Sequence, residues 1–297
     1  MNMPSPSVPA NPPPDNFSRR DFFRRLAVYA AVPIVGGIYA TQIEPFWPVF
    51  TEVSIPIPNL PKSFDGFRIA QLSDLHAGRA PFPYIQKVTA KVQQLKPDLL
   101  AVTGDLVHHT RDWVKPISAL LGNMKIPTIV SYGNHDYGVF RGDDNTADAD
   151  LPQAMEAELT RNGCIVLRNQ STTIDHPDGR LWIVGLDDWW FGDFSPHKAF
   201  TNVPQNEPVI AFSHNPDTAE QLDQHRPNLI LAGHTHGGQV RLPGIGALYL
   251  NTANHRFDQG MFHLKHSTLY VSRGIGYVRK VRFDCRPEIP IFTLTAS

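Results

Sequence analysis

Cysteine is scarce in this sequence, and so is any excess of charge of one sign. Two cysteines among 297 residues exclude a disulfide-stabilised scaffold and a thiolate-rich zinc or iron–sulfur site. Lysine and arginine together number 27 against 28 aspartates and glutamates, so the chain has no electrostatic footprint for nucleic acid. With 41% hydrophobic and 19% charged residues, a disordered or coiled-coil chain is excluded as well. The composition is that of a globular protein with one large or two small domains.

Proline is in excess, and the excess lies in the N-terminal part of the chain. Of the 27 prolines, 12 fall in residues 1–61. We expect residues 1–17 to form a disordered Pro-rich tail, because such a stretch cannot build a core. Residues 44–62 are again rich in proline but alternate apolar side chains at Val53, Ile55 and Ile57. This pattern predicts a connector that leads into an edge strand, where proline is tolerated.

Residues 18–43 have the layout of a targeting segment. The stretch Ser18-Arg-Arg-Asp-Phe-Phe23 resembles a twin-arginine export signal, and residues 26–43 carry no charge. Such a run is near the minimum length that spans a hydrocarbon core of about 30 Å. We expect a twin-arginine-type signal or a retained membrane segment, with the export machinery and the membrane as partners. The arginines then face the cytoplasm and residues 63–297 lie on the extracytoplasmic side; an unused signal leaves them on the cytoplasmic face.

From residue 63 onward, apolar strand patterns alternate with amphipathic helix patterns. Helices are predicted near 82–96, 112–122, 151–161 and 216–225, and strands near 67–73, 98–103, 127–131, 164–168, 171–175, 181–186, 208–213 and 228–232. Residues 238–296 are expected to be mainly strands. Strands that alternate with helices indicate βαβ units, and therefore an α/β fold.

Polar residues follow five of these predicted strands. They are Asp74 and His76, then Asp105, then Asn134 and His135, then His214, and finally His234 and His236. Ligands of α/β sheets bind beyond the carboxyl ends of the strands, so we expect these side chains to meet. Clustered carboxylates and imidazoles are unfavourable unless a cation offsets them. An oxygen and imidazole set without thiolate suits manganese, iron or zinc.

These residues stand in blocks that closely resemble the calcineurin-like metallophosphoesterase superfamily. The blocks are Asp74-Leu-His76, Gly104-Asp105, Gly133-Asn134-His135-Asp136, His214 and Gly233-His234-Thr-His236, complete and in order. Longer stretches, among them Ile69-Ala-Gln-Leu-Ser-Asp-Leu-His76 and Ser272-Arg-Gly-Ile-Gly276, look like its YkuE/YaeI-type membrane-associated branch. That branch includes hydrolases of UDP-2,3-diacylglucosamine.

The resemblance implies a fold and a set of site residues. Residues 63–297 would form one domain, a four-layer αββα sandwich of two mixed β-sheets flanked by helices. One divalent ion would be held by Asp74, His76, Asp105 and His236. A second would be held by Asp105, Asn134, His214 and His234, so that Asp105 bridges the two. His135 would stabilise or protonate the leaving oxygen.

The implied activity is hydrolysis of a phosphodiester, phosphomonoester or pyrophosphate by attack of a metal-bridging hydroxide. The substrate would be a small-molecule or lipid-linked phosphoester. A specific alternative is a UDP-2,3-diacylglucosamine pyrophosphate hydrolase of lipid A synthesis, although those precursors are processed in the cytoplasm and an exported enzyme would not meet them. A non-catalytic metal-binding scaffold and a protein phosphatase are the remaining alternatives.

Four features stay open at the level of sequence. The aromatic stretch 187–194 is either a rim for an acyl chain or a base, or a loop that packs on the core. His108 and His109 follow Asp105 closely and are either substrate contacts or solvated loop residues. Arg273 and Arg279 are candidate phosphate contacts. Cys164 and Cys285 are expected to be buried small hydrophobes.

The export hypothesis depends on Arg19 and Arg20. Replacing both with lysine keeps the charge and removes the twin-arginine motif, so we expect the protein to remain in the cytoplasm. Fractionation of a bacterial host with a working twin-arginine pathway measures this, with the Arg24→Lys/Arg25→Lys double variant as the matched control. Unchanged localisation of the Arg19→Lys/Arg20→Lys protein would contradict the hypothesis.

Overall fold

The computed structural model describes residues 18–138 and 148–297, so the expected tail, residues 1–17, lies outside the described part. The chain divides into two compact units, residues 1–39 and 40–297. In the first unit, the twin arginines and most of the uncharged run form helix α1 (Arg19–Ile38), which continues through Pro33. Among the described residues, no helix combines the length and the hydropathy that crossing a bilayer requires.

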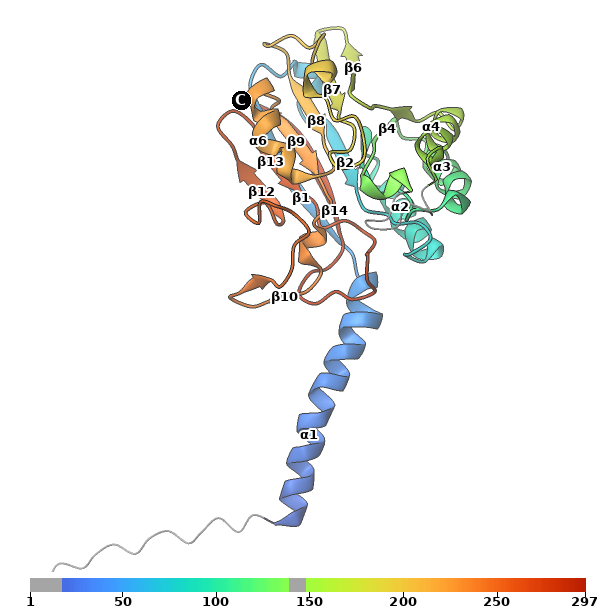
Figure 1. Cartoon of the computed structure of the whole chain (residues 1–297). Coiled ribbons are helices and arrows are strands. Elements are labelled where there is room, and N and C mark those ends of the chain that lie inside the picture. The colour runs from blue at the N-terminus through green and yellow to red at the C-terminus, as the bar shows by residue number, and fades with distance from the viewer. Residues whose placement is uncertain (1–17, 139–147) are drawn as a thin grey trace, which may run out of the picture. The chain divides into compact units, whose positions relative to one another are not determined.

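Two mixed β-sheets form the centre of the second unit (Figure 1). In spatial order, the described strands of the first sheet are β1 (Val49–Ile57), β14 (Glu288–Ala296), β2 (Arg68–Leu72), β3 (Leu99–Thr103), β4 (Thr128–Ser131) and β5 (Ile165–Val166). Those of the second are β12 (Gly260–His263), β13 (Thr268–Val271), β9 (Leu229–Ala232), β8 (Val209–Phe212), β7 (Gly179–Gly185) and β6 (Gln170–His176). The pairs β14–β2, β12–β13 and β6–β7 are antiparallel, and the remaining neighbours within these sheets are parallel.

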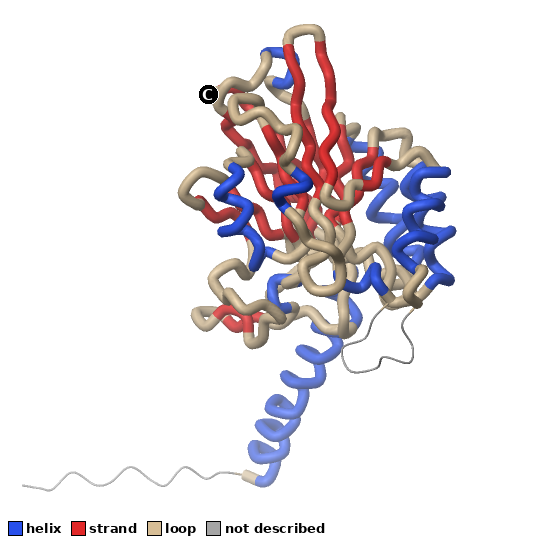
Figure 2. The backbone as a smooth tube through the Cα atoms, turned by 45° about the horizontal axis from the view of Figure 1, so that its top comes forward, coloured by secondary structure: helices blue, strands red, loops and turns tan. Residues whose placement is uncertain are grey.

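Helices cover the outer face of each sheet, as Figure 2 shows. The first sheet carries α2 (Phe82–Leu95), α3 (Val114–Gly122) and α4 (Leu151–Arg161), and the second carries the short helices α5 (Pro196–Ala199) and α6 (Ala219–Leu222). Three apolar cores separate the layers: one between the helices and the first sheet, one between the sheets, and one outside the second sheet. The predicted αββα sandwich is therefore confirmed.

The central strands are apolar on both faces because both faces are covered. In β3, Leu100 and Val102 pack toward the helices while Leu99 and Ala101 pack toward the other sheet. The central strands β2, β3, β4, β8 and β9 are accordingly buried almost throughout, and each ends at the same edge of the sandwich. This arrangement places the loops that follow them side by side.

Two expectations about local structure are wrong in detail. The helix predicted over 216–225 is split into a 3-10 turn, helix α6 and a second 3-10 turn, because Asn215 caps a tight turn at Pro216–Thr218. Residues 238–296 contain long irregular loops besides β10 (Arg241–Leu242), β11 (Gly246–Ala247), β12, β13 and β14. Buried Arg282 bonds backbone carbonyls of these loops, at Arg273, Gly276 and Cys285, in place of sheet pairing.

Residues 40–48 are bonded to the loop around Arg282. The Arg282 backbone N–H donates to the Ala40 carbonyl at 2.8 Å. The Glu44 side chain, 1% exposed, accepts the backbone N–H groups of Asp284 at 3.1 Å and of Cys285 at 2.6 Å. The segment expected as a connector, 44–62, thus lies within the compact unit that begins at Ala40, and its strand β1 is at an edge of the first sheet.

Glu44→Ala removes the acceptor of two backbone N–H groups. We expect the free energy of unfolding to fall by about 1–3 kcal/mol, since buried donors are left without a partner. Urea denaturation measures the change. Glu52→Ala on β1, at an exposed carboxylate, is the matched control and is expected to cost less than about 0.5 kcal/mol. Equal losses in the two variants would contradict this role of Glu44.

Candidate metal centre

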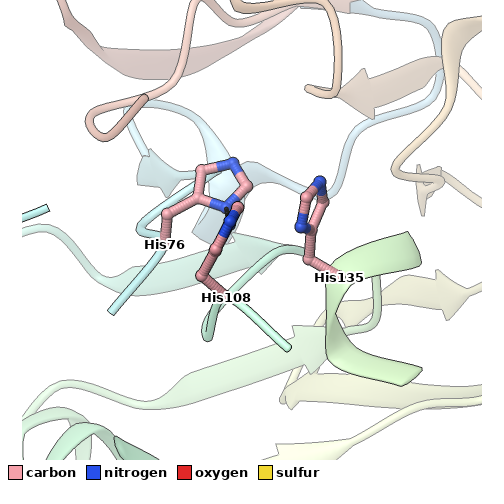
Figure 3. Close-up of side chains that lie close together, drawn as sticks. All are labelled: His76, His108 and His135. Carbon is pink, nitrogen blue, oxygen red and sulfur yellow. Dashed lines mark hydrogen bonds between the residues drawn. The ribbon is translucent and has the colours of Figure 1, made fainter. Parts of the chain in front are cut away.

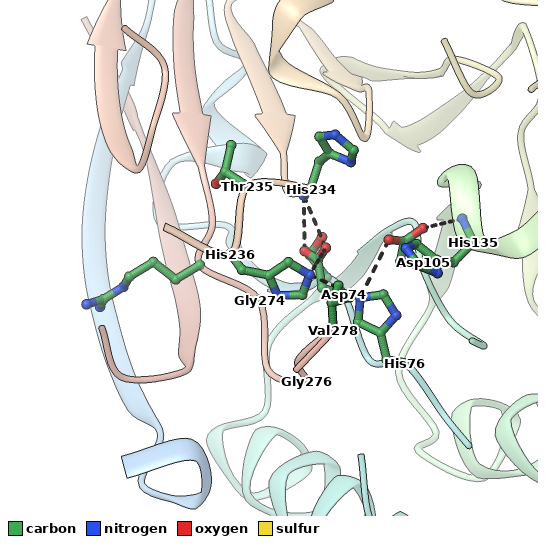
Figure 4. A network of polar contacts seen from close by, with 12 residues as sticks. Asp74, His76, Asp105, His135, His234, Thr235, His236, Gly274, Gly276 and Val278 are labelled. Carbon is green, nitrogen blue, oxygen red and sulfur yellow. Dashed lines mark hydrogen bonds and ion pairs between the residues drawn. The ribbon is translucent and has the colours of Figure 1, made fainter. Parts of the chain in front are cut away.

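The loops after β2, β3, β4, β8 and β9 bring the seven predicted ligands together at one edge of the sandwich. Figure 4 shows five of them: Asp74, His76, Asp105, His234 and His236. All seven are buried: Asp74, His76, Asp105, Asn134, His214, His234 and His236. Each lies within four residues of the end of a buried strand, so the strands fix where these side chains begin. The seven side chains lie close together, as the sequence predicts.

The backbone of these loops is held in a sparsely populated conformation. Five of the predicted ligands have φ between 47° and 71°, namely Asp74, His76, Asp105, His234 and His236. Left-handed backbone in residues other than glycine costs on the order of 1–3 kcal/mol each and concentrates at functional sites. Gly104 precedes Asp105 with φ of 89°, and a Cβ there would lie 2.6 Å from His214 Nδ1. The backbone of these loops therefore adopts an unfavourable conformation, which places the ligand side chains at the site.

The first group of side chains surrounds the end of β2. His76 Nε2 lies 3.1 Å from His236 Nε2 and 3.6 Å from Asp105 Oδ2. His236 Nε2 lies 3.3 Å from Asp74 Oδ1. Burial lowers the pKa of His236 to about 3 and the pKa of His76 well below its usual range, so both rings are neutral at pH 7. Two neutral imidazoles and two carboxylates converge here.

In the second group, His234 has acceptor oxygens at both ring nitrogens. Its Nδ1 lies 2.9 Å from Asn134 Oδ1, and its Nε2 lies 2.9 Å from the Asn251 carbonyl. Burial lowers the pKa of His234 to about 4, so the ring carries one proton at pH 7. When Nε2 holds that proton it donates to the Asn251 carbonyl, and the Nδ1 lone pair then faces the Asn134 amide. A cation between His234 and Asn134 would resolve this contact, so the residues fit a metal ion.

His214 has the same arrangement with a charged neighbour. Its Nδ1 lies 2.8 Å from the Thr103 carbonyl and its Nε2 lies 3.2 Å from Asp105 Oδ2. Burial is the largest single cause and lowers the pKa of His214. The charge of Asp105, the hydrogen bond to it and the other nearby carboxylates together outweigh burial and raise that pKa to about 10. In the ion-free chain a second proton therefore occupies the position that a cation would take.

His135 lies beside His76 and His108 (Figure 3), and His109 is a further neighbour. Its backbone N–H donates to Asp105 Oδ1 at 2.9 Å, and its ring centroid is 4.6 Å from that of His76. His108 stacks on His135 at 4.7 Å and places its Nδ1 3.2 Å from His76 Nδ1. His109 lies 4.0 Å from His135, ring to ring. The structure thus brings to the site two residues whose role the sequence left open.

Asp136 is a further residue of the site that sequence reasoning did not assign. Its carboxylate accepts the backbone N–H groups of Asp105, Leu106, Val107 and Gly133 at 2.8–3.1 Å. Burial is the main cause that raises its pKa, to about 8. Asp136 thereby ties the loop of Asp105 to that of Asn134. The signal in the sequence that could have identified Asp136 is its position as the last residue of the Gly-Asn-His-Asp block.

The aromatic stretch 187–194 is expected from the sequence to be either a rim for a substrate or a loop packed on the core, and it has features of both. Phe191 and Phe194 pack against the cores, whereas the Trp190 ring is edge-on to the His234 ring at 4.5 Å. Asp188 caps this turn through the backbone N–H groups of Trp190 and Phe191, and burial raises its pKa to about 6. The stretch is therefore a packed loop with one ring at the site.

A pocket of about 540 Å³ opens from the histidines of the site. Its polar wall includes Asp105, His135, His234 and His236, and its apolar wall includes Val240, Leu248, Tyr249, Val278 and Val281. Arg279 also lines it, whereas Arg273 is paired with buried Glu288 at 3.1 Å. Of the two candidate arginines, only Arg279 therefore borders this pocket. Cys164 and Cys285 are buried, as expected.

Comparison with known proteins identifies the family of this chain. The sequence profile described as Calcineurin-like phosphoesterase matches residues 67–238, more than half of the chain. The chain belongs to the calcineurin-like phosphoesterase family. It is similar to the metallophosphoesterase YkuE of Bacillus subtilis, with 32% identity over 94% of this chain and 98% of the relative. Phosphodiesterase YaeI of Escherichia coli is 30% identical over 93% and 99%, respectively.

A third relative is UDP-2,3-diacylglucosamine pyrophosphatase LpxG of Chlamydia trachomatis, which is 29% identical over 89% of this chain and 94% of its own. The predicted family and its YkuE/YaeI-type branch are confirmed. This calcineurin-like phosphoesterase is thus a hydrolase that acts on phosphoric esters, and the family uses divalent metal ions.

Metal binding at His214 is expected to release a proton, because a cation needs the lone pair that the proton occupies below a pKa of about 10. The apparent affinity for Mn²⁺ should therefore increase with pH from about 6.5 towards 10. Calorimetric titration in two buffers of different ionisation enthalpy counts the protons.

His214→Gln should release fewer protons per ion bound and bind more weakly. His263→Gln, at an exposed histidine of β12, is the matched control and should behave as the parent protein. Equal proton release in the parent and His214→Gln proteins would contradict the assignment of His214.

Proposed function

We propose that this chain hydrolyses a phosphodiester, phosphomonoester or pyrophosphate bond with two divalent cations. One cation would be held by Asp74, His76, Asp105 and His236, and the other by Asp105, Asn134, His214 and His234. The observation that carries the proposal is the convergence of His76 and His214 on one shared carboxylate, that of Asp105, beside the contact of His234 with Asn134. When bound, such ions polarise the phosphoryl oxygens and make water a nucleophile near neutral pH.

The ligand set would leave the loaded site positively charged, which stabilises the negative charge of a phosphoryl group during its transfer. Asn134 contributes a neutral oxygen where a carboxylate would lower the net positive charge of the loaded site. A more positive centre stabilises the additional negative charge of the transition state. Manganese, iron and zinc all suit the combination of oxygen and imidazole ligands.

His135 is proposed as the group that assists the leaving oxygen. It lies at the pocket, and its Nδ1 has no hydrogen-bond partner among the described residues. Burial lowers the pKa of His135 well below its usual range, outweighing the charge of Asp105. A neutral imidazole at pH 7 has one N–H to donate, so His135 would stabilise the leaving oxygen as its charge develops.

The proposed function is tested by removing the metal. We expect EDTA to abolish hydrolysis of an aryl phosphodiester by the full chain, and Mn²⁺ to restore it. Inductively coupled plasma mass spectrometry should find about two ions per chain. If the metal-loaded protein cleaves no phosphoester or pyrophosphate from a broad panel, the chain is a metal-binding scaffold instead.

His135→Gln is expected to lower kcat by roughly 10²–10⁴-fold on an alkyl leaving group and by much less on a nitrophenyl leaving group. The reason is that a good leaving group needs little assistance. Steady-state kinetics on matched esters measures both values, and metal content should remain unchanged. His263→Gln is the control, and an equal loss on both esters would contradict the role of His135.

A second candidate is the hydrolysis of a lipid-linked pyrophosphate such as UDP-2,3-diacylglucosamine. The similarity to LpxG and the apolar wall of the pocket favour it. Assaying this compound beside mono- and diesters decides between the two. Turnover of UDP-2,3-diacylglucosamine at the cytoplasmic face would also contradict the proposed export of residues 63–297, because that precursor is made in the cytoplasm.

A further inference from the structure

The β10–β11 hairpin (Figure 1) carries exposed apolar side chains, two of which line the pocket. Ile245, Leu248 and Tyr249 are 73%, 57% and 71% exposed, the three largest values for large hydrophobic side chains among the described residues of 40–297. We call these three residues the hairpin surface. Leu248 and Tyr249 also form part of the pocket wall, so the surface is continuous with the mouth of the site. Contiguous exposed apolar side chains mark interaction surfaces.

Cationic side chains lie beside the hairpin surface. Arg279 and Lys280 are exposed, and Arg279 lines the same pocket as Leu248 and Tyr249. Gln239, at the base of the hairpin, donates to the backbone carbonyl of Arg279 at 2.6 Å, which fixes the two segments against each other. Exposed apolar side chains beside exposed basic side chains suit a bilayer with anionic headgroups.

The last residues of the uncharged run, 40–43, belong to the second unit and lie near the hairpin. Arg282 bonds the Ala40 carbonyl, and the next residue, Phe283, pairs with Val240 at the base of the hairpin. The Lys280 ammonium donates to the Gln42 side chain at 2.8 Å. The hairpin, the basic loop and the end of the segment without charge are therefore neighbours within one compact unit.

We propose that the hairpin surface inserts into the headgroup region of a lipid bilayer, with Arg279 and Lys280 on anionic headgroups. This contact is made by the catalytic body itself and adds to any attachment through residues 18–43. It orients the pocket mouth toward the bilayer. The inference does not depend on the proposed hydrolysis, because it concerns side chains outside the metal centre.

A fluorescent label at the hairpin tests the contact in the full chain. Cys164 and Cys285 are buried, so Ile245→Cys provides a single accessible thiol for an environment-sensitive dye. The matched control is Ile165→Cys on β5, since Ile165 is an exposed aliphatic residue 47% accessible to solvent. Both labelled chains keep the same N-terminal segment, so recruitment through that segment is equal.

On vesicles of phosphatidylcholine with about one-third phosphatidylglycerol, the dye at position 245 should shift to the blue. Brominated acyl chains should quench it several-fold more than the dye at position 165. Arg279→Glu combined with Lys280→Glu should reduce this quenching several-fold on anionic vesicles and little on phosphatidylcholine alone.

Three results would overturn the proposal. In the first, the labelled chain sediments with vesicles while the dye at 245 stays in water. In the second, the dyes at 245 and 165 are quenched equally. In the third, the dye at 245 shifts without vesicles as protein concentration rises, which would show that a second copy covers the hairpin surface.

Discussion

The site depends on one buried carboxylate, that of Asp105. Its Oδ1 accepts the backbone N–H of His135, and its Oδ2 faces His76 on one side and His214 on the other. Burial opposes ionisation, yet the neighbouring histidines outweigh it and hold the pKa of Asp105 well below its usual range. A buried anion of this kind requires positive charge nearby, from protons or from metal ions. Without a bound cation, protonated His214 provides this charge, and the neutral imidazoles around it suit a metal ion.

Arg282 holds the backbone of loops that border the site. It bonds backbone carbonyls of the loops that carry His236 and Gly274, and a Cβ at Gly274 would lie 2.6 Å from Asp74 Cβ. Glu44 holds the segment that follows Arg282 through two backbone N–H groups. Glu44, just after the uncharged N-terminal run, therefore supports the loops that border the ligands. A change at Glu44 would affect the geometry of the site.

The pocket has two chemically different walls, and this difference bears on function. Histidines and Asp105 form one wall, while Leu248, Tyr249 and neighbouring valines form the other. A substrate with an apolar group close to its phosphoester would contact both. Because the apolar wall continues into the exposed hairpin, access from a lipid surface and recognition of an apolar substrate would use the same residues.

The sequence by itself determined the α/β class, most strands and helices, and the polar residues at the strand ends, because burial periodicity and short motifs are local. It left His108 open and did not assign Asp136 or Arg282, since their roles consist of contacts to distant backbone and rings. It misjudged 216–225 and 238–296, where capping and a buried arginine replace regular pairing. Only the tertiary structure decided that Trp190 meets His234 and that the hairpin borders the pocket, because both contacts join segments far apart in the chain.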